Sequence, residues 1–244
     1  VKDVLQEMIA ILQEGNLKPD PQAIAPWWET IQQWRKRDCL KYDRDDMSVI
    51  KPQFVIETLW NMTKDTETYI TSDVGQHQMW AAQYYKFDQP RRWINSGGLG
   101  TMGYGFPAAV GAQIAHPNRL VICIAGEASL QMNIQEMGTV SQYRLPVKVF
   151  ILNNEYMGMV RQWQELLHGG RYSESYSAAL PDFVALAKII AQALGEEPRD
   201  LVLDGESRIL EELKGHGEEL GGVHVGREGE RPERRGGVRG RGGV

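Results

Sequence analysis

The first part of the chain carries apolar residues at helical spacing. In residues 2–14 they recur every three or four positions, which predicts an amphipathic helix that ends at Gly15. Residues 16–26 contain three prolines and are predicted to form a connector. A second helix is predicted at 27–38, and a third at 52–62, where the initial proline is compatible with a helix start.

From residue 68 onward, short apolar runs alternate with helical patterns. Strands are predicted at 68–71, 92–95, 120–125 and 147–152, and helices at 75–85, 106–114, 130–143, 156–167 and 181–194. Strands that alternate with helices of this length indicate βαβ units and a parallel sheet. The strongly apolar runs 120–125 and 147–152 suit the centre of a sheet covered on both faces. The predicted class is therefore α/β, with a doubly wound, mostly parallel sheet and helices on both faces.

The composition changes towards the end of the chain. Every Phe, Tyr and Trp lies at or before Phe183, although the chain runs to residue 244. Residues 221–244 are mostly Gly, Arg, Glu and Val, which cannot build a packed core. We expect a disordered tail at 196–244, with one further short helix at 209–213. Two Arg-Gly-Gly repeats in this tail admit RNA binding, but a reading-frame change or recombination in the coding sequence is the favoured interpretation.

Net charge and cysteine content exclude several classes of protein. The net charge of −5 provides no general attraction to nucleic acid, which is not an expected partner. No apolar run approaches the roughly 18 residues of a membrane span, and no signal peptide is visible. Two cysteines are too few for a disulfide framework, and Cys123, inside an apolar run, is predicted to be buried. We therefore expect a reduced, intracellular setting without membrane contact.

Polar or glycine-rich segments follow each predicted strand, at the edge where open parallel sheets bind ligands. They are residues 73–77, 96–100, 126–129 and 153–154. From Gly98 to Gly103 the chain fits G-x-G-x-x-G, so a dinucleotide-binding turn is one interpretation, with Glu127 as the ribose-binding acid. On this motif alone, a tight βα connection that needs small residues is favoured.

A second pattern joins two neighbouring strand ends. Glu127 follows the strand 120–125, and Asn153-Asn154 follows the next strand. A carboxylate and an amide so placed can bind one Mg²⁺ ion, which prefers oxygen ligands and is usually shared with phosphates. Backbone N–H groups at the next helix start would bind those phosphates. Taken singly, Ser129 and Asn154 are better explained as helix N-caps.

Taken together, these residues resemble the thiamine-diphosphate motif, Gly-Asp-Gly followed about two dozen residues later by Asn-Asn. Here Gly126-Glu127-Ala128 and Asn153-Asn154 are separated by residues 129–152. Ala128 replaces the second glycine, and Glu127 replaces the aspartate with a side chain one methylene longer. Because Mg²⁺ demands near-ideal octahedral geometry, we expect weaker cofactor binding and an intact fold.

The flanking sequence narrows the resemblance to one family. The chain resembles the catalytic large subunit of acetohydroxyacid synthase (acetolactate synthase), most clearly in residues 75–83, 96–107, 145–149 and 157–164. The resemblance runs from about residue 1 to about Ala187. It implies a connector and the end of a central domain at 1–50, a thiamine-diphosphate-binding domain at 51–195 that is incomplete at its C-terminal end, and the atypical tail.

The resemblance also implies roles for individual residues. Those expected at the diphosphate are Gly75, Gln76, His77, Ser129 and the backbone from Gly126 to Ala128. The expected Mg²⁺ ligands are Glu127, the side chain of Asn154 and the backbone oxygen of Tyr156. At the rings of the cofactor, the Gly100 carbonyl would meet the aminopyrimidine and Met102 would wedge between the two rings. Met159 and Trp163 would line the substrate channel, although their spacing also fits one buried helix face.

The reaction implied is a decarboxylating condensation of two 2-keto acids. Pyruvate would yield 2-acetolactate, or 2-aceto-2-hydroxybutyrate with 2-ketobutyrate, in branched-chain amino acid biosynthesis. The cofactors implied are thiamine diphosphate, Mg²⁺ and, in full-length relatives, FAD. The family's catalytic glutamate and main FAD site lie in domains absent here. We therefore assign no catalytic residue to this chain and expect no synthase activity from it alone.

The family further implies a homodimer or tetramer, a small regulatory subunit and a bacterial cytoplasmic location, with plastids and mitochondria as alternatives. Two rival functions stay open. One is another thiamine-diphosphate enzyme, such as pyruvate oxidase or glyoxylate carboligase, which residues 76–82 and 161–163 disfavour. The other is a truncated, non-catalytic chain, which Glu127 and the atypical tail favour.

Overall fold

The computed structural model describes residues 1–18, 20–45 and 49–193, in two units divided after Asp43. The first unit contains α1 (Lys2–Glu14), as predicted, and α2 (Pro21–Arg35). The predicted connector is wrong for its second half, because α2 begins at Pro21 rather than at residue 27. Asp20 caps this helix by accepting the N–H of Gln22 at 2.9 Å, and proline is well suited to a first helical position.

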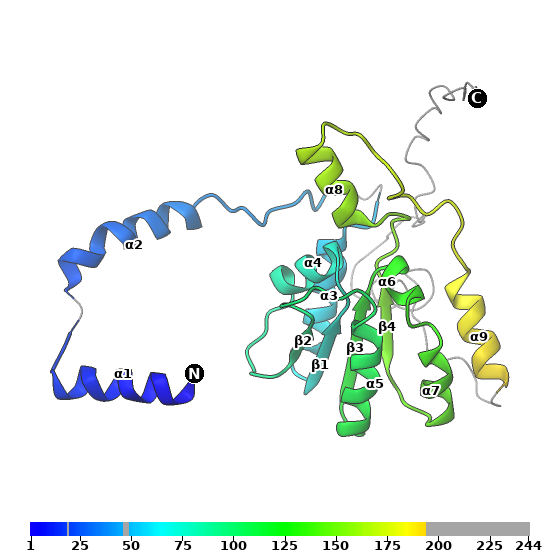
Figure 1. The fold of residues 1–244 in the computed structure, drawn as a ribbon, viewed down its shortest axis with the longest axis horizontal. Helices are drawn as coiled ribbons and strands as arrows, with labels where there is room; N and C mark the ends of the chain where they lie inside the picture. The colour runs from blue at the N-terminus through cyan, green and yellow to red at the C-terminus, as the bar shows by residue number, and fades with distance from the viewer. Residues whose placement is uncertain (19, 46–48, 194–244) are drawn as a thin grey trace, which may run out of the picture. The chain divides into compact units, whose positions relative to one another are not determined.

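The second unit is built on a parallel sheet of four strands in the order β2-β1-β3-β4 (Figure 1). Its elements are α3 (Pro52–Thr63), β1 (Thr68–Ser72), α4 (Gln76–Tyr84), β2 (Trp93–Asn95), α5 (Gly105–Ala115), β3 (Leu120–Ala125), α6 (Glu127–Gln131), α7 (Glu136–Gln142), β4 (Lys148–Ile151), α8 (Gly158–Leu167) and α9 (Phe183–Ala193). All four predicted strands are present. The predicted α/β class with a parallel sheet is confirmed.

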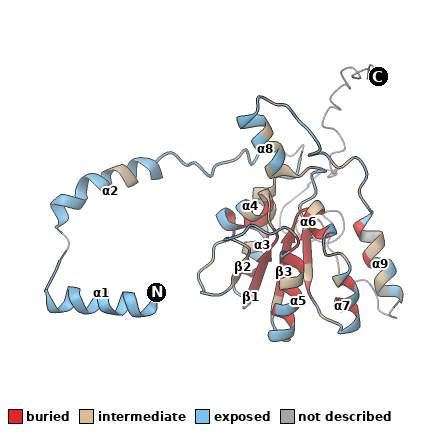
Figure 2. Cartoon of the chain, in the orientation of Figure 1, coloured by how far each residue is buried: buried red, intermediate tan, exposed pale blue. Residues whose placement is uncertain are grey.

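Both faces of the sheet are buried, as Figure 2 shows for β1 and β3. On one face, Val121 and Cys123 of β3 belong to an apolar cluster with Phe106 of α5, and α7 and α9 extend this layer. Because strand side chains alternate, Ile122 and Ile124 point to the other face, where α4 packs against β1 and β3, with α3 beside it. Of the two central strands, β3 is apolar throughout, which explains its clear sequence signal, whereas β1 is buried although it carries Thr68, Thr71 and Ser72. The run 147–152, expected at the centre of the sheet, forms β4, which lies at the edge of the four described strands.

One predicted helix is divided in two. The expected helix 130–143 appears as α6, which begins directly after β3, and α7, with a turn between them. In that turn the backbone bonds span three residues, as from Asn133 N–H to the Leu130 carbonyl at 3.2 Å. The Asn133 side chain donates to the carbonyl of Gly103, so a contact distant in sequence fixes the turn.

Other expectations have simpler outcomes. Helix α8 begins at Gly158, two residues later than predicted, because Tyr156 pairs with Tyr176 in an isolated β-bridge. Cys123 is fully buried, as predicted, and Cys39 is exposed. The helix predicted at 209–213 and the tail at 196–244 lie outside the described residues. Among the helices in the described part of the chain, none is long and apolar enough to cross a membrane.

Candidate functional site

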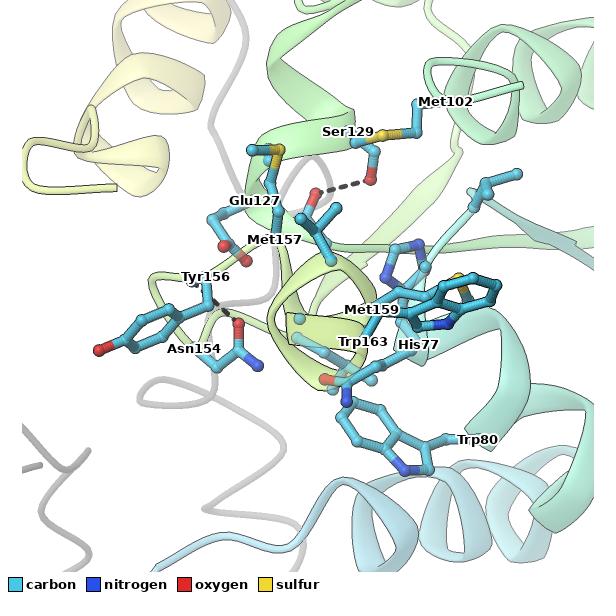
Figure 3. Close-up of a pocket in the computed structure, with 18 of the residues that line it drawn as sticks. His77, Trp80, Met102, Glu127, Ser129, Asn154, Tyr156, Met157, Met159 and Trp163 are labelled. Carbon is cyan, nitrogen blue, oxygen red and sulfur yellow. Dashed lines mark hydrogen bonds between the residues drawn. The ribbon is translucent and has the colours of Figure 1, made fainter. Parts of the chain in front are cut away.

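A pocket of about 440 Å³ lies beyond the carboxyl ends of the strands (Figure 3). All residues singled out from the sequence line it: Gly75, Gln76, His77, Gly100, Met102, Gly126, Glu127, Ala128, Ser129, Asn154, Tyr156, Met159 and Trp163. Parallel strands bring their carboxyl ends to one edge of the sheet, which explains why loops distant in sequence converge here. The structure thus assembles the candidates in one place, whereas their individual roles remain predictions.

One wall of the pocket is an imidazole held between two glycines. A Cβ atom at Gly75 would lie 2.7 Å from the His77 ring, and one at Gly126 would lie 2.9 Å from it, so neither position accepts a side chain without rearrangement. The His77 side chain is buried, and its Nε2 atom has no hydrogen-bond partner. Burial lowers the pKa of His77 to about 4, against the opposing effect of Asp73. The ring is therefore neutral at pH 7.

The same pocket also holds a carboxylate without a partner. Glu127 is 1% exposed, and neither of its carboxylate oxygens accepts a hydrogen bond. Burial raises the pKa of Glu127, while nearby backbone N–H groups, including those of Asn154 and Tyr156, act in the opposite direction. Figure 3 shows these three residues next to one another at the pocket. A buried carboxylate costs free energy unless it is paired or binds a cation, so this group is suited to a metal ion.

The loop after β4 presents the remaining expected ligands. The Asn154 Oδ1 atom accepts the N–H of Tyr156 at 3.1 Å, and the turn places Glu155 at a φ of +61°. Neither Asn154 nor Ser129 is a helix N-cap, because Met157 precedes α8 and Gly126 precedes α6. The N-cap interpretation of these two residues is therefore wrong.

A neighbouring segment, residues 173–177, braces this loop. The N–H of Met157 donates to the carbonyl of Ser175 at 2.9 Å, and the N–H of Ser177 donates to the carbonyl of Glu155 at 2.8 Å. The Ser175 hydroxyl, itself buried, donates to Gln164 of α8 at 2.8 Å. Sequence reasoning missed this brace, since no motif or spacing links the two segments.

The mouth of the pocket is apolar. Met159 and Trp163 lie on α8, which has no buried residue, and Trp163 is 59% exposed. The alternative that these side chains form one buried helix face is therefore wrong. Trp80 and Met157 also line the pocket and were not predicted from the sequence. These large apolar side chains form part of the lining of the pocket.

The carboxylate of Asp73, directly after β1, is a further residue that the candidate set lacked. It accepts the N–H groups of Gly103 and Gly105, each at 2.9 Å. These two amides of the glycine loop, residues 97–105, are therefore engaged within the protein. A dinucleotide-binding turn would instead direct such amides at a pyrophosphate, so the interpretation of residues 98–103 as such a turn finds no support.

No cluster of three or more His, Cys, Asp or Glu side chains that could hold a metal occurs among the described residues. The expected magnesium ligands include only one such residue, Glu127, together with an amide and a backbone oxygen. The donor set nevertheless fits Mg²⁺, which accepts amide and carbonyl oxygens and keeps sites for phosphate and water. The carboxylate oxygens of Glu127 and Nε2 of His77 have no partner within the protein, so they are available to a cation and to a hydrogen-bond acceptor respectively.

The comparisons with known proteins agree with this geometry. Residues 73–205, more than half of the chain, match the family described as "Thiamine pyrophosphate enzyme, C-terminal TPP binding domain". The chain belongs to this family. The match extends beyond Ala187, where the sequence resemblance was expected to fade.

Within that family the chain is similar to acetolactate synthase large subunits. It is 56% identical over 187 residues to the isozyme 3 large subunit of Escherichia coli (strain K12), a stretch that covers 77% of this chain and 32% of the relative. It is 51% identical to the large subunit of Haemophilus influenzae, with the same coverage. The Porphyra purpurea subunit is 48% identical over 189 residues, 77% of this chain and 31% of the relative. The chain thus spans about a third of the length of these relatives, and the resemblance inferred from the sequence is confirmed.

Proposed function

We propose that this chain supplies the diphosphate- and magnesium-binding half of a thiamine-diphosphate site in an acetolactate synthase. The observation that carries the proposal is the pair of buried, partnerless polar groups that line one pocket, the carboxylate of Glu127 and Nε2 of His77. Family membership supports the cofactor, and the names of the relatives support the reaction.

Each residue of the pocket has a proposed role that follows from the chemistry of its side chain or backbone. Glu127, the side chain of Asn154 and the backbone oxygen of Tyr156 hold Mg²⁺, which neutralises the diphosphate. The neutral His77 donates a hydrogen bond to a phosphate oxygen, and the glycines at 75 and 126 let the imidazole pack closely against the backbone. When bound, thiamine diphosphate supplies the electron sink for decarboxylation of a 2-keto acid. Met159 and Trp163 keep water away from the reacting atoms.

The wider assignment follows the relatives. The proposed substrates are two 2-keto acids, with pyruvate converted to 2-acetolactate or, with 2-ketobutyrate, to 2-aceto-2-hydroxybutyrate for branched-chain amino acids. FAD, a dimer or tetramer, a small regulatory subunit and a cytoplasmic or plastid location belong to the same proposal. Because no catalytic residue is assigned to this chain, we expect it alone to convert no pyruvate to acetolactate, and detectable conversion would contradict this division of the site.

Calorimetric titration of the chain with thiamine diphosphate and Mg²⁺ tests the proposal. Wild type should bind weakly, Glu127→Asp should bind more tightly because the shorter side chain restores the family's ligand geometry, and Glu127→Gln should lose the Mg²⁺ dependence. Glu165→Gln, which removes an exposed carboxylate of α8 outside the pocket, is the matched control. Absence of Mg²⁺-dependent binding in both wild type and Glu127→Asp would favour the alternative of a non-catalytic chain.

A further inference from the structure

Asp73 joins two parts of the site that are distant in sequence. Its side chain is fully buried at the end of β1, where it accepts the N–H of Val74 at 2.8 Å. Its two carboxylate oxygens accept the N–H groups of Gly103 and Gly105 from the glycine loop, one oxygen each, at 2.9 Å. Hydrogen bonds to an ionised acceptor are roughly twice as strong as neutral ones. The carboxylate thereby fixes the return of the loop to the sheet.

The loop is held from its carbonyl side as well. The carbonyl of Gly103 accepts the side-chain amide of Asn133, and the carbonyl of Gly105 accepts the hydroxyl of Thr71 at 2.9 Å. A Cβ atom at Gly105 would lie 2.4 Å from the backbone nitrogen of Asp73, so loop and strand are in close contact. Each of the two glycines is thus bonded through both its N–H and its C=O.

The anchored glycines follow directly on the residues that face the pocket. Gly100 and Met102 line the pocket from the same loop, and Gly103 comes immediately after Met102. By contrast, the residues proposed for the diphosphate, such as His77 and Ser129, lie on α4 and α6. The rings of the cofactor would therefore contact the glycine loop, and its diphosphate would contact α4 and α6. Only the glycine loop is held by the hydrogen bonds to Asp73 described above.

From this geometry we infer that Asp73 is a positioning residue for the part of the site expected to face the cofactor rings, which Gly100 and Met102 form. Its carboxylate fixes the position of the glycine loop. It thereby also fixes where the Gly100 carbonyl and the Met102 side chain lie relative to the cofactor rings. The inference rests on the proposed function for the identity of the ligand. The contact between Asp73 and the loop does not depend on it.

The first test measures the loop without any ligand. In Asp73→Asn, one carboxylate oxygen becomes an NH₂ group that cannot accept the Gly103 or Gly105 N–H. Hydrogen exchange should accelerate about tenfold to a hundredfold at the amide that faces the new NH₂ group, the change expected for loss of a charge-assisted bond, whereas the other amide keeps an oxygen acceptor. Amides of β3 should keep their protection. Equal exchange rates in wild type and variant would overturn the inference.

The second test separates the two ends of the cofactor. With Mg²⁺ present, Asp73→Asn should weaken thiamine diphosphate binding about tenfold or more, while inorganic pyrophosphate should bind within about threefold of wild type. Asp182→Asn is the matched control, since Asp182 also accepts a backbone N–H, from Ala185 at 2.8 Å, but on the exposed start of α9. Far-ultraviolet circular dichroism of each variant confirms that it folds.

The outcomes are distinguishable. Selective loss of thiamine diphosphate binding supports the inference, and equal loss of both ligands, or loss of neither, overturns it while the proposed function stands. If neither wild type nor Glu127→Asp binds either ligand, the proposed function and the ring-positioning role fail together. The exchange rates of Gly103 and Gly105 then decide alone whether Asp73 anchors the loop.

Discussion

Protonation of His77 should make the stability of the chain depend on pH in a defined direction. The imidazole is buried between two glycines, and its pKa lies near 4 against an ordinary value of 6.5. As the pH falls through 6.5, His77 becomes protonated in the unfolded chain, whereas in the folded chain it is not protonated until about pH 4. The contribution of His77 is therefore fully present above pH 6.5 and is lost as the pH falls towards 4.

The size of the effect follows from the two pKa values. Because a tenfold change in an equilibrium constant corresponds to about 1.4 kcal/mol, the full gap is worth about 3 kcal/mol, of which about 2 kcal/mol appears between pH 7.5 and 5. Glu127 acts in the opposite direction, since its pKa is raised and acid relieves its burial. A comparison of variants is therefore needed to isolate the histidine.

Urea denaturation at pH 7.5 and 5 of wild type and His77→Gln provides that comparison. Wild type should lose about 2 kcal/mol more free energy of unfolding than the variant does between the two conditions. His168→Gln, at the exposed end of α8, should behave like wild type because His77 remains in place. If wild type and His77→Gln show the same pH dependence, the ring is not buried in its neutral form and the description of this wall is wrong.

Two further predictions concern the scaffold around the site. In α5, Gly105→Ala should destabilise the fold by roughly 1–3 kcal/mol, because the new Cβ would meet the backbone of Asp73 at 2.4 Å. Gly111→Ala in the same helix has open space and should stabilise it by roughly 0.5–1 kcal/mol in thermal and urea unfolding, and the reverse order would contradict the packing. Gln113→Met should cost about 2 kcal/mol, since the buried Gln113 amide donates to the carbonyls of His116, Pro117 and Arg119. Gln131→Met removes a single bond, from an exposed side chain to the backbone carbonyl of Glu127, and should cost less than about 0.5 kcal/mol. Equal losses in the two variants would refute that account.

The sheet was predictable because its signal is local. Strand β3 is a continuous apolar run, and a strand buried on both faces needs no partner information to be recognised. Strand β4 is apolar apart from Lys148, which is enough to mark it as a strand, but it lies at the edge of the described sheet and not at its centre. The start of α2 was missed because prolines suggested a connector, although Asp20 before Pro21 is itself a helix-start signal. The break between α6 and α7 left no such trace, since it depends on a bond from Asn133 to a loop thirty residues away.

In the candidate site, too, residues with a local sequence signal could be predicted, whereas those that depend on contacts distant in sequence could not. Glu127 and Asn154 could be predicted because a motif with fixed spacing connects them, and the topology then brings their loops together. Asp73 belongs to no spacing pattern, and its importance arises only when the glycine loop folds back over the end of β1. The brace at residues 173–177 is likewise formed by backbone bonds, which carry no side-chain signature.

The two partnerless groups in the pocket connect the stability of the chain with its proposed ligand. A buried polar group without a hydrogen bond costs roughly 1–3 kcal/mol, and His77 and Glu127 both lie in this condition. Any side chain at residue 75 or 126 would collide with the imidazole, so the glycines there allow the ring to occupy its buried position. A cation at Glu127 and an anion at His77 would satisfy both groups at once, and a ligand that binds only the folded state stabilises it. The groups that weaken the unliganded fold are thus the same groups that would make binding favourable.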